Sequence, residues 1–154
     1  MNILANDGVS KNCVLKLEEN GFRVIQDKVE QEELADYINS ESIEVLLVRS
    51  ATKVRKELID NCPNLKFIGR GGVGMDNIDV DYARSKGIEV TNTPAASSIS
   101  VAEIVFAHLF SLARSLFKSN RSMPLEGDSK FKQLKKEYAK GIELRGKTIG
   151  IIGF

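Results

Sequence analysis

The sequence predicts an α/β fold built on a doubly wound, parallel β-sheet. Short apolar segments alternate with segments of helical period from residue 2 to residue 92, and the connections between them are short. The segment at residues 43–48 is apolar almost throughout, as is typical of a strand buried on both faces of a parallel sheet. In addition, glycine or proline follows three of the predicted helices. These patterns favour parallel strands joined by right-handed helical crossovers.

The strands and helices of this first region are expected to alternate. We expect strands at residues 2–5, 22–25, 43–48, 66–68 and 88–91. We expect helices at residues 11–20, 31–39, 53–61 and 80–86, because apolar side chains recur there at helical spacing. Asp79 is the predicted N-cap of the last of these helices. In such a sheet, ligands bind beyond the carboxyl ends of the strands.

A longer helix is expected at residues 101–118. Ser100 and Glu103 match the S-x-x-E capping box, which gives Glu103 a structural explanation. Apolar residues cover most of the circumference of this helix, so we expect a partner subunit or a further domain to bury it. His108 is the only histidine and has no second ligand or carboxylate at helical spacing, so we interpret it as a packed side chain.

A loop, a helix and a strand are expected in the remaining residues. The loop is predicted at residues 119–127, the helix at residues 128–139, and a strand at residues 148–152 that leads into Gly153. The lysines of the predicted helix are interpreted as a solvated face. They are Lys130, Lys132, Lys135, Lys136 and Lys140.

Composition limits the classes of function. The chain has 22 basic and 21 acidic residues and a net charge of +1, which argues against a general nucleic-acid or membrane surface. Cys13 and Cys62 belong to no metal or redox motif, so we expect reduced thiols and a cytoplasmic protein. We find no apolar run of the ~20 residues that a membrane-spanning helix needs. We also expect no signal peptide, since the N-terminus lacks a charged segment followed by a long apolar core.

A glycine-rich segment at residues 67–79 is the feature around which the first region is organised. Four glycines fall within six residues: Gly69, Gly71, Gly72 and Gly74. Glycine lets another atom approach the bare backbone closely, and backbone N–H groups in such a turn can bind an anion. Arg70 lies inside the turn and Arg49 follows the neighbouring predicted strand, so each adds a guanidinium. The segment therefore predicts a carboxylate or phosphate site.

Two other interpretations of the glycine segment remain open at this point. Gly69, Gly71 and Gly74 match G-x-G-x-x-G, the dinucleotide-binding fingerprint. That motif needs a helix at its end and an acid about 20 residues on, whereas here the helix begins late and the next strand ends at Asn92. The segment also fits a surface turn that is simply rich in glycine.

Five segments, in this order along the chain, resemble the D-2-hydroxyacid dehydrogenase family. They are Val48-Arg49-Ser50-Ala51-Thr52-Lys53-Val54, the segment Gly69–Asp79, Asn92-Thr93-Pro94, Ser100-Val101-Ala102-Glu103, and the segment Leu144–Gly153. The resemblance implies a flavodoxin-like substrate lobe at residues 1–99 and the beginning of a Rossmann dinucleotide-binding domain at residues 100–154. It implies hydride transfer between NAD and a small anionic 2-hydroxy acid, and a homodimer formed through the helix that starts near Val101. We expect the chain to stop inside that second domain and to be inactive alone.

The same resemblance assigns residues to the site. Those implied at the substrate are Arg49, Ser50, Arg70, Gly72, Val73, Gly74 and Asn92, with the backbone of Gly72–Gly74 at the carboxylate. Those implied at the cofactor are Val73 and Val101, near the nicotinamide, and Gly153. The family's catalytic arginine, glutamate and histidine are expected beyond Phe154, so no catalytic residue is assigned to this chain, and no metal is expected.

Three alternatives compete with this interpretation. The first is another member of the same family, of the glyoxylate or hydroxypyruvate reductase type or of the D-lactate dehydrogenase type. The second is a non-enzymatic, NAD-sensing regulator on the same scaffold. The third is a signalling receiver, which is also a doubly wound sheet but needs clustered acids at the strand ends, where Asp7 stands alone.

Overall fold

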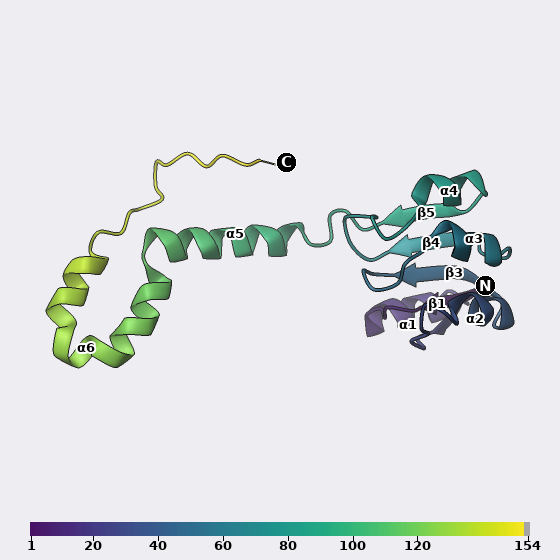
Figure 1. The fold of residues 1–154 in the computed structure, drawn as a ribbon, viewed down its shortest axis with the longest axis horizontal. Helices are drawn as coiled ribbons and strands as arrows, with labels where there is room; N and C mark the ends of the chain where they lie inside the picture. The colour runs from purple at the N-terminus through teal and green to yellow at the C-terminus, as the bar shows by residue number, and fades with distance from the viewer. Residues whose placement is uncertain (153–154) are drawn as a thin grey trace. The chain divides into compact units, whose positions relative to one another are not determined.

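The computed structural model describes residues 1–152, so Gly153 lies outside the described residues. The chain divides into two compact units, Met1–Ser97 and the part from Ser98 onward (Figure 1). Each unit is considered by itself. The first contains every strand of the described part of the chain and the second is helical.

The first unit is a five-stranded parallel sheet in the order β2-β1-β3-β4-β5 (Figure 1). Its strands are β1 (Asn2–Ala5), β2 (Arg23–Ile25), β3 (Ile43–Val48), β4 (Phe67–Arg70) and β5 (Glu89–Asn92). This strand order is that of the flavodoxin-like doubly wound fold, in which ligands bind where the order reverses. The predicted α/β class with a parallel sheet is confirmed.

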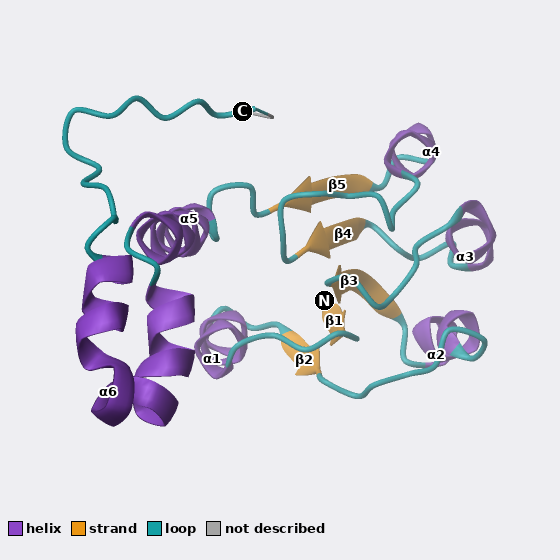
Figure 2. Ribbon diagram, turned by 60° about the vertical axis from the view of Figure 1, so that its left-hand side comes forward, coloured by secondary structure: helices purple, strands orange, loops and turns teal. Residues whose placement is uncertain are grey.

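Four short helices cover this sheet: α1 (Lys11–Glu19), α2 (Leu34–Ser40), α3 (Lys56–Asn61) and α4 (Val80–Ser85). Helices α2, α3 and α4 lie on one face of the sheet and α1 lies on the other (Figure 2). The core is densest beneath α2 to α4, where alternate strand residues point to one face. Leu46, Ile68 and Val90 occupy neighbouring positions of β3, β4 and β5 there and are almost fully buried.

Two predicted helix starts in this unit are wrong by three residues, since α2 begins at Leu34 and α3 at Lys56. In the second case Val54 is held in a parallel β-bridge with Ile78. The Asp79 carboxylate then accepts a hydrogen bond of 3.0 Å from the backbone N–H of Lys56, the first residue of α3. Asp79 is the N-cap residue of α4, as predicted, but its side chain makes no capping bond there and instead stabilises the beginning of α3.

The second unit contains α5 (Ser98–Ala113) and α6 (Leu116–Tyr138), and its course differs from the prediction. The long helix ends at Ala113, because Ser115 adopts a left-handed conformation (φ 54°), and a new helix follows. The predicted loop at 119–127 is helical despite Pro124, and the helix is instead interrupted at Lys130. Residues 148–152 form no strand, and no neighbouring strand is present in the described part of this unit to pair with them.

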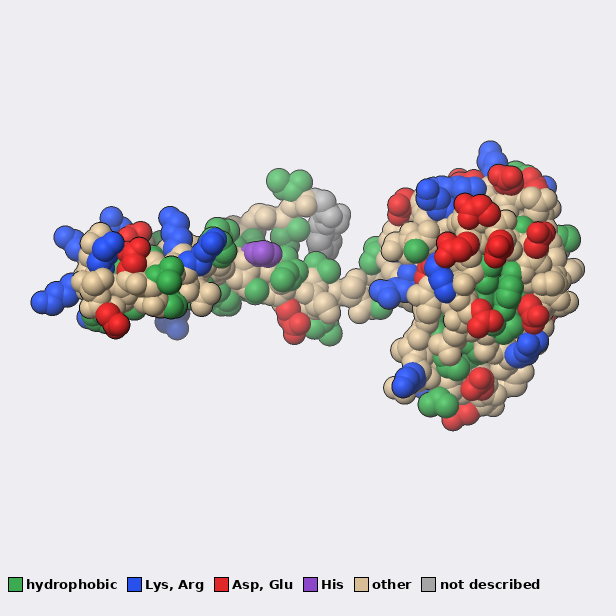
Figure 3. Space-filling model, turned by 60° about the horizontal axis from the view of Figure 1, so that its bottom comes forward, with side chains coloured by type: hydrophobic (Ala, Val, Ile, Leu, Met, Phe, Trp, Pro, Cys, Tyr) green, Lys and Arg blue, Asp and Glu red, His purple; other side chains and the backbone are tan. Residues whose placement is uncertain are grey.

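Two further predictions for the second unit are wrong. Helix α5 already begins at Ser98, so Ser100 lies inside the helix and the predicted capping box with Glu103 is wrong. His108 is exposed and not packed, and α5 has no fully buried residue within the described part of the chain (Figure 3). The five lysines of the α6 region are exposed, as predicted. Within the described residues, membrane-span length and apolarity are met only by α5 and α6 taken as a pair, which is bent by 55°, and by no single helix.

Candidate functional site

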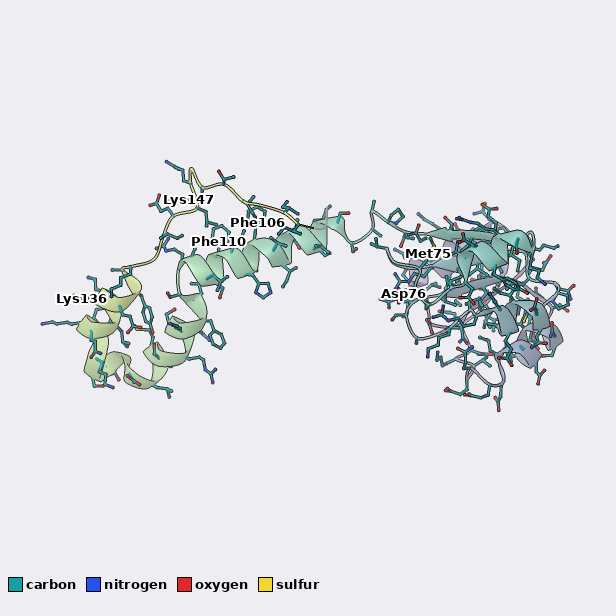
Figure 4. The ribbon with its side chains drawn as sticks, turned by 45° about the horizontal axis from the view of Figure 1, so that its top comes forward. Met75, Asp76, Phe106, Phe110, Lys136 and Lys147 are labelled. Carbon is teal, nitrogen blue, oxygen red and sulfur yellow. The ribbon has the colours of Figure 1, made fainter. Side chains whose placement is uncertain are left out.

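An open cavity of about 740 Å³ lies at the carboxyl ends of the strands in the first unit. The loop after β4 lies at this edge, and Figure 4 labels Met75 and Asp76 in it. The lining combines apolar strand residues with polar residues of the loops that follow. It consists of Asp7, Gly8, Val9, Ser10, Cys13, Leu47, Val48, Arg49, Phe67, Gly69, Arg70, Gly71, Thr91, Asn92 and Thr93.

Strand register brings the two predicted arginines to this cavity. Val48 of β3 pairs with Arg70 of β4, and Arg70 in turn pairs with Asn92 of β5. Arg49 directly follows Val48, so the two arginines lie one residue apart in register at the ends of adjacent parallel strands. Gly71 lies directly beside the Arg49 side chain, since a Cβ on it would stand 3.6 Å from the Arg49 Cγ, an ordinary van der Waals distance.

Neither arginine is neutralised by an acidic side chain. The arginine ion pairs of residues 1–152 are formed by Arg23 and Arg55, and not by Arg49 or Arg70. The Nε atom of Arg70 is also buried and has no hydrogen-bond partner among the described residues. A buried donor without an acceptor is costly, so an anion that reached this guanidinium would gain a charge-assisted hydrogen bond.

The acidic side chain beside this cavity, that of Asp7, is already compensated. It is 4% exposed and forms an ion pair of 3.0 Å with the Lys28 ammonium. Burial raises the pKa of this carboxyl, but hydrogen bonds from Arg49, Thr52 and Lys28 outweigh burial and bring the pKa down to about 2. Asp7 is therefore ionised at neutral pH and its charge is balanced, which leaves the two guanidinium charges to dominate the cavity.

The glycine turn after β4 offers backbone donors next to the arginines. Gly72 donates from its N–H to the Thr93 hydroxyl at 2.9 Å and accepts from the Thr93 N–H at 3.1 Å. Asn92 donates from Nδ2 to the Val73 carbonyl at 2.5 Å. The N–H groups of Val73 and Gly74 have no acceptor within residues 1–152. The turn is thus held by β5 and its loop, with two N–H groups left for a ligand.

Glycine leaves room for a neighbouring side chain at two positions of this segment. A Cβ on Gly72 would collide with the guanidinium of Arg70, so glycine there lets the arginine lie across the turn. A Cβ on Gly69 would stand 2.8 Å from Leu47 Cδ2, because Gly69 lies inside β4 beside β3. With Gly69 in a strand and the next helix starting only at Val80, the segment does not form a dinucleotide-binding turn.

Comparison with known proteins identifies the family of this chain. The family described as "D-isomer specific 2-hydroxyacid dehydrogenase, catalytic domain" matches residues 3–139. The chain belongs to this family. D-3-phosphoglycerate dehydrogenases are among its curated relatives, at about 40% identity over nearly the whole chain.

Two curated relatives and one solved structure illustrate the range of the family. D-3-phosphoglycerate dehydrogenase of Methanocaldococcus jannaschii is 42% identical over 98% of this chain and 27% of its own length. Hydroxypyruvate reductase of Thermotoga maritima is 41% identical over 97% of this chain and 46% of its own length. D-lactate dehydrogenase of Aquifex aeolicus, solved with NAD and lactic acid, is 30% identical over 80% of this chain and 37% of that one, with a TM-score of 0.61. The chain thus spans about a quarter to a half of these relatives.

Some residues assigned by the family resemblance meet in the first unit and others do not. Arg49, Arg70 and Asn92 line the cavity. Ser50 lies in an adjoining hollow with Arg49 and Lys28. Val73 is 53% exposed in the glycine turn. Gly72 and Gly74 belong to the same turn. Val101 is exposed on α5 in the second unit, and Gly153 lies outside the described residues.

Several cavity residues were missed by the sequence analysis. Leu47, Phe67 and Thr91 line it from β3, β4 and β5, on the sheet face opposite Leu46, Ile68 and Val90. Their alternation with the buried positions was the signal that could have found them. Cys13 and Ser10 contribute from the beginning of α1, and no local pattern distinguishes them. Asn92 was predicted beside the substrate, but its amide is engaged in holding the turn.

Proposed function

We propose that the protein carrying this chain is an NAD-dependent D-2-hydroxyacid dehydrogenase whose first unit binds a small anionic 2-hydroxy acid. The observation that carries the proposal is the pair of unneutralised arginines, Arg49 and Arg70, at the ends of adjacent parallel strands. The free N–H groups of Val73 and Gly74 lie in the turn that directly follows Arg70. Together these groups are suited to a carboxylate and a second anionic or polar group.

The roles of the residues follow from their chemistry. Arg49 and Arg70 bind and orient the anion, and the glycine turn donates to the carboxylate. When bound, NAD supplies the hydride chemistry, and the protein contributes position and electrostatics. Val73 and Val101 are proposed to contact the nicotinamide, which is supported by their exposed apolar side chains. Asp7 is not an acid–base group at neutral pH, because its pKa lies near 2.

D-3-phosphoglycerate is the substrate that we favour among the 2-hydroxy acids. It carries two anionic groups, which suits two unpaired guanidinium groups, and proteins of this specificity are among the relatives. A relative of nearly equal identity is a hydroxypyruvate reductase, so a reductase of glyoxylate or hydroxypyruvate, or an enzyme of the D-lactate dehydrogenase type, is the second candidate. Relative turnover of these acids decides between them.

A homodimer through α5 and a cytoplasmic location complete the proposal. Most apolar side chains of α5 are exposed within the chain, Phe106 and Phe110 among them (Figure 4). Burial by a second copy of the same helix would satisfy this surface. The near balance of charge supports a protein that binds neither nucleic acid nor membranes.

The test of the binding site is the Michaelis constant of the full-length enzyme. Arg70→Ala removes a charge-assisted contact and is expected to raise KM for the acid about thirtyfold, equivalent to about 2 kcal/mol. Arg23→Ala is the matched control, since Arg23 is exposed on the edge strand β2 and pairs with Glu41, which follows α2. An Arg70→Ala enzyme whose KM stayed within twofold of the wild type would contradict the assignment.

A further inference from the structure

The loop that carries Arg49 is fastened to the rest of the unit by side chains. Asp7 accepts at Oδ2 from the backbone N–H groups of Arg49 (2.7 Å) and Thr52 (3.1 Å). Its other oxygen, Oδ1, accepts from the Thr52 hydroxyl at 2.7 Å and from Lys28 at 3.0 Å. One buried carboxylate thus binds both ends of the loop at residues 49–52.

A second side chain, that of Asn77, binds the backbone carbonyls of Arg49 and Thr52. Asn77 is 6% exposed and donates from Nδ2 to the carbonyls of Arg49 (2.9 Å) and Thr52 (2.7 Å). Asn6 adds a hydrogen bond of 2.9 Å to the Thr52 hydroxyl. The N–H groups of Arg49 and Thr52 therefore donate to Asp7, which follows β1. Their carbonyls accept from Asn77, which lies in the loop after β4.

We infer that Asp7 and Asn77 are positioning residues that set the direction in which Arg49 enters the substrate cavity. The inference rests on the proposed function, since it concerns how that site binds its anion. Arg49 itself makes no side-chain hydrogen bond or ion pair within residues 1–152, so its direction is set by its backbone. A displacement of about 1 Å in a group that orients a substrate is enough to lower an enzyme's efficiency strongly.

Asp7 and Asn77 act through Arg49 and do not need to touch the substrate. The four acceptor contacts of Asp7 leave its carboxylate saturated. Both donor protons of the Asn77 amide are directed to the loop carbonyls. A change in KM for the acid without a change in KM for NAD would therefore separate this positioning role from a general loss of structure.

The kinetic test uses the full-length enzyme and two nearly isosteric variants, Asp7→Asn and Asn77→Asp. Asn77→Asp places an acceptor opposite the loop carbonyls, and Asp7→Asn removes the charge and replaces one of the two accepting oxygens with a donor. We expect KM for the acid to rise about tenfold, equivalent to about 1.4 kcal/mol, with KM for NAD within twofold. Asp60→Asn is the matched control, because Asp60 is also an ion-paired, hydrogen-bonded carboxylate but lies on α3 and pairs with Lys86.

A second control separates positioning from stability. Leu58→Ala removes a buried side chain of α3 and destabilises the unit without changing the loop. Assayed well below its melting temperature, this variant is expected to keep the wild-type KM. A KM for the acid that rose as much in Leu58→Ala as in Asp7→Asn would overturn the positioning role.

Hydrogen exchange provides a readout that does not depend on catalysis. In the substrate-free enzyme, Asp7→Asn is expected to speed exchange in the peptide that contains the Arg49 and Thr52 amides by at least about tenfold, and Asp60→Asn is expected to leave it unchanged. Unchanged exchange in Asp7→Asn would overturn the inference.

Arg49→Ala tests the substrate site and the positioning role separately. If Arg49→Ala raises KM for the acid and Asp7→Asn does not, the positioning role is contradicted and the proposed site is not. If neither variant changes KM for the acid, both are contradicted.

Discussion

The two units of the chain bury their apolar side chains to very different extents. Of the buried hydrophobic residues in the described part of the chain, all but Leu134 lie before Ser98. The second unit instead exposes large apolar residues along α5, including Leu112 at 81%. The first unit supplies the neighbours that its own strands and helices need, whereas the second needs further surface to cover it.

Polar groups show the same contrast. The loops of the first unit are joined by buried hydrogen bonds between distant residues, such as Asn6 to Thr52 and Asn77 to Arg49. The side-chain bonds of the second unit are mostly between residues three or four apart, such as Ser119 to Leu116. A pre-organised binding site needs long-range bonds of the first kind, so the difference favours the first unit as the place where a substrate is held.

The largest effect expected from this contrast is a loss of stability in the sheet. Leu46 is fully buried in β3, so Leu46→Ala should lower the free energy of unfolding of the first unit by about 3 kcal/mol. Leu125→Ala, the same change at an 84% exposed position of α6, should cost less than about 0.5 kcal/mol. Urea denaturation followed by circular dichroism measures both. Equal losses of unfolding free energy in the two variants would contradict the expectation that the buried leucine contributes more.

A somewhat smaller effect concerns pH and Asp7. Its pKa falls from the usual 3.8 to about 2 on folding, which corresponds to about 2 kcal/mol of stability at neutral pH. Because the folded-state value is the lower one, this contribution is complete above about pH 4 and is lost as the pH falls toward 2. The stability difference between wild type and Asp7→Asn should therefore be constant from pH 5 to 8 and narrow below pH 4. A difference that did not change on acidification would contradict the role of the ionised carboxylate.

The smallest effect tests whether a second copy covers α5. Phe106 is 53% exposed, and its ring centroid lies 6.4 Å from that of Phe110. In the dimer that we propose, Phe106→Ala should weaken self-association about tenfold, equivalent to about 1.4 kcal/mol. Lys136→Ala on α6 is the control and should leave it unchanged. Sedimentation equilibrium measures the association, and an unaffected dimer in Phe106→Ala would place the interface elsewhere.

The sequence predicted most of the first unit because its information there is local. Apolar runs such as residues 43–48 identify strands directly, and parallel register then brings Arg49 and Arg70 to one edge without further knowledge. The contacts that fix the site were not predictable in this way. Asp79 stabilises α3 from a position 23 residues away, and Asn77 reaches across 28 residues to Arg49.

The second unit was predicted less well because its local signals conflict. Residues 119–127 contain glycine, proline and serine, which predict a loop, yet Ser119 and Ser122 donate to carbonyls of the preceding turn and the segment stays helical around Pro124. The apolar run at residues 148–152 predicts a strand, but a strand forms only beside another. Pattern alone does not supply that partner.

The two arginines of the first unit are proposed to bind the anionic end of a 2-hydroxy acid. The sharpest test compares kcat/KM for the acid with kcat/KM for its carboxamide, in which an uncharged amide replaces the carboxylate, in the wild type, Arg49→Ala and Arg70→Ala. The wild type should prefer the acid strongly, and at least one arginine variant should lose about thirtyfold of that preference, or about 2 kcal/mol. An acid-to-amide preference that remained the same in both variants would contradict the assignment of Arg49 and Arg70 to the anionic end of the substrate.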